Sequence, residues 1–248
     1  MSSLWTVGTR EPAASVRMIC FAHAGGGSAL FLPWRRMLAP HVDVCPIVLP
    51  GRERRIHEPP HTRMDDLVEE LVPAVEPLLD RPYVLFGHSM GAMVAYEVAR
   101  RLRPAPAMVF VSGRRVPGVT GVRHLLDDDA FLKVLKGLGG TPSTVLDSQD
   151  LAKLFLPALR ADYRLVETYR PAVTPPLSCP LVALTGDADP EVTPAQMARW
   201  GDLTTDGFGL HVFPGDHFYL KGLPEVLRRT LLDAMGPLTG RTAIRGRS

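Results

Sequence analysis

YVLFGHSMG, residues 83–91, is the stretch that decides the fold of this chain. An apolar, strand-like run leads into a G-x-S-x-G sequence, and a helical pattern, 92–99, follows it. This strand–turn–helix context is typical of a nucleophile elbow, a sharp turn that lifts a serine, here Ser89, above a sheet. Glycines flank the serine because strand and helix nearly touch there, so a Cβ atom would clash. The alternative interpretation is a glycine-rich turn with an inert serine.

Apolar runs alternate with helical patterns along most of the chain. We predict strands at Val16–Phe21, Val42–Leu49, Tyr83–Phe86, Ala107–Val111, Pro180–Thr185 and Leu210–Phe213. We predict helices around Phe31–Leu38, Met64–Leu79, Ser89–Leu102, Pro194–Trp200 and Leu223–Met235. This alternation predicts an α/β fold, in which helices cover both faces of a mostly parallel central sheet.

One stretch, from about residue 116 to 173, contains no convincing strand. Two helical patterns, Ala130–Leu138 and Leu151–Tyr169, flank a glycine-rich segment at 137–143. We expect residues 116–173 to be a helical lid inserted into a core formed by 1–115 and 174–240. The alternative is an elaboration that has only a packing role. The tail 241–248, rich in arginine and glycine, is expected to be disordered.

Composition excludes several classes of function. The formal net charge of +2 argues against nucleic acid as a partner. Neither a signal peptide nor an apolar stretch long enough for a membrane is visible. The three cysteines are an odd number without close spacing, which favours a reducing cytoplasm over disulfides or a zinc site. With no metal-ligand cluster, Walker lysine or G-x-G-x-x-G, we expect neither a metal nor another cofactor.

A serine hydroxyl needs a base, and the base needs an orienting carboxylate. Hydrolases with this elbow keep the chain order serine, acid, histidine. His217 follows the last predicted strand and is the best candidate for the base. For the acid we prefer Asp189 to Asp187, because the later residue reaches further past its strand. Asp187 would then stabilise a turn.

A tetrahedral intermediate also needs two N–H donors for its oxyanion. One is expected from Met90, the residue after the nucleophile, and the other from the loop after the first strand. That loop reads His23-Ala24-Gly25-Gly26-Gly27, and Ala24 is the expected donor.

Six segments together resemble a known family, the type II thioesterases, which are editing hydrolases of modular polyketide synthases and nonribosomal peptide synthetases. The segments are CFAHAGGG at 20–27, LPGR at 49–52, GHSMG at 87–91, VSGR at 111–114, GDADP at 186–190 and FPGDHFYL at 213–220. The resemblance implies an α/β-hydrolase fold with a helical lid. It implies hydrolysis of acyl thioesters on the phosphopantetheine arm of an acyl or peptidyl carrier protein. It also implies that Ser89 is the nucleophile, His217 the base and Asp189 the acid, with Ala24 and Met90 as oxyanion donors.

Two other functions stay open at this point. One is an esterase or acyltransferase of the same fold that acts on free small-molecule esters, and the other is a non-catalytic binding module. The lid's candidates for lining an acyl chamber are Leu125, Phe131, Leu132, Leu135, Leu154, Phe155 and Leu159. Most apolar residues at helical spacing are simply core, so we expect only some of these to line a pocket. Five arginines after strand ends could steer an acidic carrier protein or could simply be solvated: Arg52, Arg54, Arg55, Arg114 and Arg115.

Overall fold

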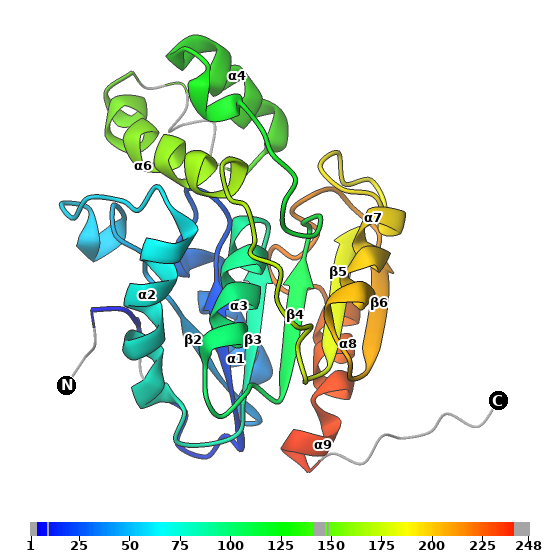
Figure 1. Ribbon diagram of the computed structural model, residues 1–248. Helices are drawn as coiled ribbons and strands as arrows, with labels where there is room; N and C mark the ends of the chain where they lie inside the picture. Colours follow the sequence, from blue (N-terminus) through cyan, green and yellow to red (C-terminus); the bar gives the residue numbers. More distant parts are fainter. Residues whose placement is uncertain (1–3, 9, 141–146, 148, 241–248) are drawn as a thin grey trace.

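The structure, a computed structural model, describes residues 4–8, 10–140, 147 and 149–240 (Figure 1). The tail 241–248 and the later part of the glycine-rich segment, 141–143, lie outside the described residues. Within the described ranges, no helix is both long enough and apolar enough to cross a bilayer.

A six-stranded sheet runs through the described part of the chain (Figure 1). Its strands are β1 (Val16–Phe21), β2 (Val42–Pro46), β3 (Tyr83–His88), β4 (Met108–Ser112), β5 (Leu181–Gly186) and β6 (Phe208–Phe213). The strands follow the order β2-β1-β3-β4-β5-β6, and each neighbouring pair is parallel. The predicted parallel α/β sheet is therefore confirmed.

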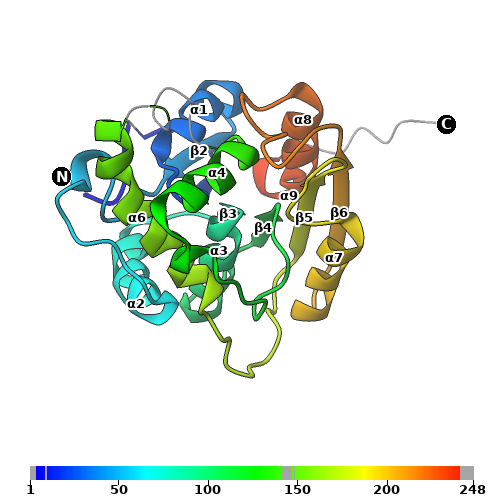
Figure 2. The same ribbon diagram turned by 90° about the horizontal axis from the view of Figure 1, so that it is seen from above.

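Helices cover both faces of the sheet, as expected (Figure 2). They are α1 (Leu32–Leu38), α2 (Met64–Val75), α3 (Met90–Arg101), α7 (Pro194–Ala198), α8 (Glu225–Ala234) and α9 (Gly236–Thr239). Helices α2, α3 and α7 lie on one face, and α1, α8 and α9 lie on the other. Each face has its own apolar core: Leu67 and Trp200 belong to the first, and Trp34 and Leu227 to the second.

The strand order creates a crevice at the carboxyl ends of the neighbouring strands β1 and β3. From β1 the chain moves to the edge strand β2, and it then returns to β3 on the other side of β1. Loops that leave neighbouring strands in opposite directions open a crevice at the carboxyl ends of those strands. The register pairs Phe21 of β1 with Gly87 of β3, so the loop after β1 lies beside the elbow after β3.

Strand β2 and helix α2 are both shorter than predicted. Strand β2 ends at Pro46, because Ile47, although its N–H still bonds to Cys20, pairs in antiparallel fashion with Thr6. Helix α2 ends at Val75 and continues only as a 3₁₀ turn, Glu76–Leu78. Pro77 explains this end, since proline has no N–H to continue the α-helical ladder.

The segment between β4 and β5 contains two longer helices, α4 (Asp128–Leu138) and α6 (Gln149–Glu167), preceded by the 3₁₀ turn η4 (Arg123–Leu125). Both helices lie above the carboxyl ends of the strands (Figure 1). They share a small apolar core, in which Phe131 and Leu135 of α4 meet Leu156 and Leu159 of α6. The described residues of 116–173 contain no strand. Hereafter we call this segment the insertion.

Two glycines near the end of α4 should respond in opposite ways to replacement by alanine. A Cβ atom at Gly137, inside the helix, would meet no described atom within 4 Å. Gly139 caps the helix in the left-handed region, at φ 70°. We expect Gly137→Ala to raise the free energy of unfolding by about 0.5–1 kcal/mol, because alanine loses less backbone entropy. Gly139→Ala should lower it by about 1–2 kcal/mol, because L-residues are strained at positive φ.

Denaturant titration of both variants beside the parent chain measures the two effects. Similar changes of the same sign at both positions would contradict this account of the helix end.

Candidate functional site

The turn between β3 and α3 holds Ser89 in an unusual backbone conformation, at φ 54° and ψ −115°. Its N–H donates to the carbonyl of Ser112 on β4, at 2.8 Å. The flanking glycines permit this geometry: a Cβ atom at Gly91 would lie 2.1 Å from the carbonyl oxygen of Phe21. A Cβ at Gly87 would lie 2.0 Å from the carbonyl oxygen of Gly91. The expected close approach of strand and helix is thus confirmed.

His217 and Asp189 meet at the carboxyl ends of β6 and β5. Nδ1 of His217 donates to Oδ2 of Asp189 at 2.8 Å, and the histidine side chain is only 5% exposed. The second oxygen of Asp189 accepts the backbone N–H of Glu191, also at 2.8 Å. With its hydrogen on Nδ1, the neutral ring presents Nε2 as an acceptor.

Asp187 and Asp216, the neighbouring carboxylates, brace the loops instead. Oδ1 of Asp187 accepts the N–H of Gly215 at 2.9 Å, which joins the loop after β5 to the loop after β6. Oδ1 of Asp216 accepts the N–H of Phe218 at 2.7 Å. The structure therefore brings Asp189, and not Asp187, to the histidine.

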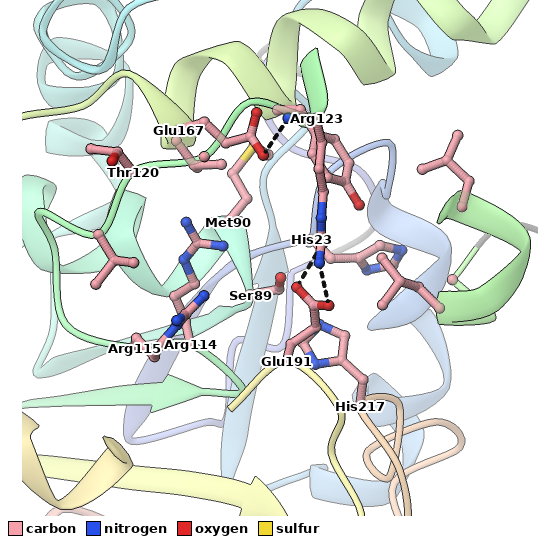
Figure 3. A pocket seen from close by; sticks show the side chains of 18 of the residues that line it. His23, Ser89, Met90, Arg114, Arg115, Thr120, Arg123, Glu167, Glu191 and His217 are labelled. Atoms are coloured by element: carbon pink, nitrogen blue, oxygen red, sulfur yellow. Dashed lines mark hydrogen bonds and ion pairs between the residues drawn. The ribbon is translucent and has the colours of Figure 1, made fainter. Parts of the chain in front are cut away.

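A cavity of about 310 Å³ lies under the insertion (Figure 3). Ser89, Met90, His217 and Ala24 all line it. Asp189 lies behind the histidine, with its side chain fully buried. The five residues expected from the sequence thus converge on one place, from loops that follow β1, β3, β5 and β6.

Two backbone amides of the loop after β1 already have partners. The N–H of Gly25 donates to Oδ2 of Asp162 on α6 at 2.7 Å, and the N–H of Gly26 donates to the carbonyl of His23 at 2.9 Å. Met90 is the first residue of α3, where backbone N–H groups have no partner within the helix. The geometry is therefore compatible with oxyanion donors at Met90 and at Ala24, both of which line the cavity.

Several polar residues of the cavity escaped the sequence reasoning. Arg123 of the insertion forms two hydrogen bonds with Glu191, at 2.8 and 3.0 Å (Figure 3). Burial by itself would raise the pKa of Glu191, but the hydrogen bonds and charge of Arg123 lower it. Arg114, which the sequence did indicate, also lines the cavity, and burial lowers its pKa. The only signal in the sequence is that Glu191 follows Asp189 by two positions. Nowhere in the described ranges do three His, Cys, Asp or Glu side chains gather to hold a metal ion.

Two of the five expected docking arginines are structural. The guanidinium of Arg52 binds both oxygens of Asp162, at 2.8 and 2.7 Å, and both side chains are buried. The side chain of Arg55 is buried and pairs with Glu58. Neither arginine can therefore meet a partner protein, so the expectation is wrong for both. Position after a strand end did not reveal that both side chains are buried, or that the acid of Arg52 lies 110 positions away.

Arg114 and Arg115 do line the cavity, and in the view of Figure 3 they lie across Ser89 from Glu191. Arg54 is exposed and donates to the carbonyl of Leu4 at 3.0 Å.

Three of the apolar insertion residues expected to line a chamber do line a cavity. Leu135 lines the cavity over the serine. Phe155 and Leu159 line a second cavity, of about 430 Å³, which the glycines of the loop after β1 also line. We call these the first and the second cavity.

The expectation is wrong for Leu125 and Leu154, which are 72% and 55% exposed. Phe131 is fully buried in the insertion's own core, and Leu132 packs against that core. Helical spacing identifies the apolar face of a helix but does not tell whether that face meets a core or a cavity.

Two further histidines are held neutral beside the site. His88 is fully buried, its Nδ1 lies 3.0 Å from Oγ of Ser112, and burial keeps its pKa well below the usual value. The hydrogen bond of His88 is therefore to Ser112 and not to Ser89. Burial, followed by the positive charge of nearby groups, lowers the pKa of His23 to about 3.

These two histidines predict a pH dependence of stability. Between about pH 6.5 and 3 the unfolded chain binds protons that the folded chain does not, so stability falls as the pH falls. Each histidine should contribute about 1.4 kcal/mol per pH unit below its unfolded pKa. His88→Gln should remove one such contribution between pH 7 and 5, measured by urea titration at several pH values. His57→Gln, at an exposed position, should keep the parent's slope. A parent chain equally stable at pH 7 and 5 would contradict the assignment.

Comparison with known proteins agrees with this geometry. A model of the thioesterase domain family matches residues 16–231. The gramicidin S biosynthesis protein GrsT of Aneurinibacillus migulanus is 37% identical over 215 residues, which are 84% of this chain and 84% of GrsT.

Two solved structures are similar over nearly the whole chain. RedJ, the thioesterase of the prodiginine biosynthetic pathway in Streptomyces coelicolor, is 41% identical with a TM-score of 0.83, and the match covers 91% of each chain. BorB, the type II thioesterase of the borrelidin biosynthetic cluster, is 36% identical with a TM-score of 0.82, and the match covers 97% of this chain and 98% of BorB. The chain therefore belongs to the thioesterase domain family, with the α/β-hydrolase fold that its sequence predicts.

Proposed function

We propose that this chain is a type II thioesterase that removes stalled or aberrant acyl groups from carrier proteins of a polyketide synthase or nonribosomal peptide synthetase. The observation that carries the proposal is the arrangement of Ser89, His217 and Asp189: an oriented histidine shares a cavity with the serine of a nucleophile elbow. The relatives support the substrate class, since BorB is a type II thioesterase of a biosynthetic cluster.

In the first half of the proposed reaction, Oγ of Ser89 attacks the carbonyl carbon of the thioester while Nε2 of His217 takes its proton. Asp189 holds the ring in the required tautomer and stabilises the imidazolium that forms. The negative oxygen of the tetrahedral intermediate accepts the N–H groups of Ala24 and Met90. The C–S bond then breaks, and His217 returns the proton to the departing pantetheine thiol.

In the second half, a water molecule attacks the acyl-serine ester, and His217 again acts as the base. The tetrahedral intermediate collapses, Ser89 regains its proton from His217, and the carboxylic acid leaves. These steps need only side chains and backbone amides that the chain itself supplies.

Carrier proteins are the proposed partners because their long phosphopantetheine arm could reach a serine that lies under the insertion. The serine lies under the insertion, 116–173, which we propose to act as a lid over the core 1–115 and 174–240. Arg114 and Arg115 line the first cavity and can receive the arm's amide carbonyls or its phosphate. The three cysteines are free and buried, as is usual in a reducing compartment, so we place the reaction in the cytoplasm.

The substrate class is tested with one acyl group on three leaving groups. Hydrolysis of a propionyl carrier protein, a propionyl thioester of N-acetylcysteamine and a propionyl oxygen ester is compared by kcat/KM. The proposal requires the carrier-bound thioester to be the best of the three. A free oxygen ester that matches or exceeds it would instead favour a small-molecule esterase.

Ser89→Ala removes the proposed nucleophile and should lower thioester turnover by about 10⁴- to 10⁶-fold. The folded structure should persist, because alanine keeps the Cβ atom and the hydroxyl is not needed for the turn. Steady-state hydrolysis and labelling by a fluorophosphonate probe measure the loss. Circular dichroism controls for folding. If the folded variant kept more than a few per cent of the parent activity, Ser89 would not be the nucleophile.

Asp189→Asn should lower turnover by about 10³- to 10⁴-fold, because an amide no longer fixes the tautomer of His217. Asp187→Asn is the matched control, since its oxygen accepts only the N–H of Gly215. An asparagine oxygen can accept the same bond, so we expect a loss of less than about tenfold. The reverse ranking would assign the acid to Asp187.

A further inference from the structure

The second cavity lies directly beside the proposed catalytic site. Of the described residues, His23 and Gly140 line both cavities. The first cavity contains the serine, and the side of it that His23 lines is shared with the second cavity of about 430 Å³.

Neighbouring rings hold the side chain of His23 in place. The ring of Phe218 meets it edge-on with centroids 4.8 Å apart, and the ring of His88 meets it at 5.9 Å. A Cβ atom at Gly26 would lie 2.7 Å from the ring, and one at Gly140 would lie 2.5 Å from Phe218. Both glycines are therefore necessary for this packing.

The lining of the second cavity suits an apolar ligand. Its larger side chains include Leu30, Pro33, Phe155 and Leu159. Its charged residues have partners of their own. Arg52 pairs with Asp162, Glu53 accepts the N–H and hydroxyl of Ser28, and Lys221 donates to the carbonyl of Gly139.

The lining of the first cavity contains more charged side chains. Five charged residues, Arg114, Arg115, Arg123, Glu167 and Glu191, line it around the serine, and Arg123 and Glu191 pair with each other. A thioester has one polar end, the amide-rich arm, and one apolar end, the acyl chain. The charged cavity therefore suits the arm, and the apolar cavity suits the far end of a longer chain.

From this arrangement we infer that His23 is a specificity-determining residue, which limits the length of the acyl chain by closing the second cavity to it. Short acyl groups on Ser89 stay in the first cavity. A chain of about ten carbons has to displace the His23 ring from its three-ring packing before its end can enter the second cavity. This inference rests on the proposed thioesterase function.

The test compares kcat/KM for propionyl and decanoyl pantetheine thioesters. The parent chain should favour the propionyl substrate. His23→Ala should raise the decanoyl-to-propionyl ratio by about tenfold or more, since each further methylene group that becomes buried strengthens binding about fourfold. His23→Phe, which restores a ring at this position, should keep the parent ratio. The ratio is informative even if both rates fall, because a general effect on the neighbouring Ala24 changes them together.

A second variant tests whether the end of the decanoyl chain enters the second cavity. Ala29, an exposed residue of the second cavity's lining, can be replaced by phenylalanine to occupy that cavity from outside. In the His23→Ala background, Ala29→Phe should return the ratio toward the parent value. If His23→Ala does not fold, His23→Ser is measured in its place, with alkyl fluorophosphonates of the two chain lengths as an independent readout.

The possible failures are distinguishable. A parent chain that hydrolyses neither thioester would overturn the proposed function, and the inference with it. A parent chain that hydrolyses both, together with an unchanged ratio in the alanine and serine variants, would overturn only the role of His23. A gain that Ala29→Phe does not reverse would also overturn the assignment of the second cavity.

Discussion

The site depends on one close contact between two segments of backbone. The first turn of α3 approaches the end of β1 so closely that a Cβ atom at Gly91 would overlap the carbonyl of Phe21. This approach places Ser89 beside the loop that follows β1, and it requires positive φ at the serine. Such a conformation costs on the order of 1–3 kcal/mol and persists only where the surroundings enforce it. Here the fully buried strand β3 and the buried helix α3 enforce it from both sides.

A second backbone contact aligns Asp189, the proposed acid, with His217, the proposed base. The loops after β5 and β6 are joined by hydrogen bonds from Asp187 N–H to Phe213 and from Ala188 N–H to Gly215, at 2.8 and 3.0 Å. Gly186 lets them touch, since its Cβ would lie 2.3 Å from the carbonyl of Gly215. Main-chain atoms thus set the distance between Asp189 and His217. Their own hydrogen bond would then need little reorganisation during the proposed reaction, which is how a preorganised site lowers a barrier.

The sequence predicted the features that depend on nearby residues, namely the strands and the candidate site residues that follow them. Continuous apolar runs identified the buried parallel strands, and the order serine, acid, histidine located three residues that the structure brings together. The choice of Asp189 over Asp187 rested on reach past a strand end, and the observed hydrogen bond follows it. Helix and strand ends were less accurate where proline or an extra bridge intervened, as at Pro77 and Ile47. The partners of buried charges were not predictable, because Asp162 lies 110 positions from Arg52, and nothing near either residue indicates the other. The sequence also could not show that Leu125 is exposed or that His23 lines two cavities, because both depend on how distant segments pack.

The buried carboxylate of Asp162 has a consequence for how this chain could be recombined with its relatives. It belongs to α6, yet it holds Arg52 and the N–H of Gly25, both of which belong to the sheet's own loops. Removing one partner of a buried charge pair typically costs about 3–5 kcal/mol. The insertion is therefore not an exchangeable module: a chimera that takes it from another member of the family inherits a buried arginine without its counter-charge, unless the donor helix carries an acid at the same place. A chimera that folds should therefore take residues 25, 52 and 162 from the same parent protein.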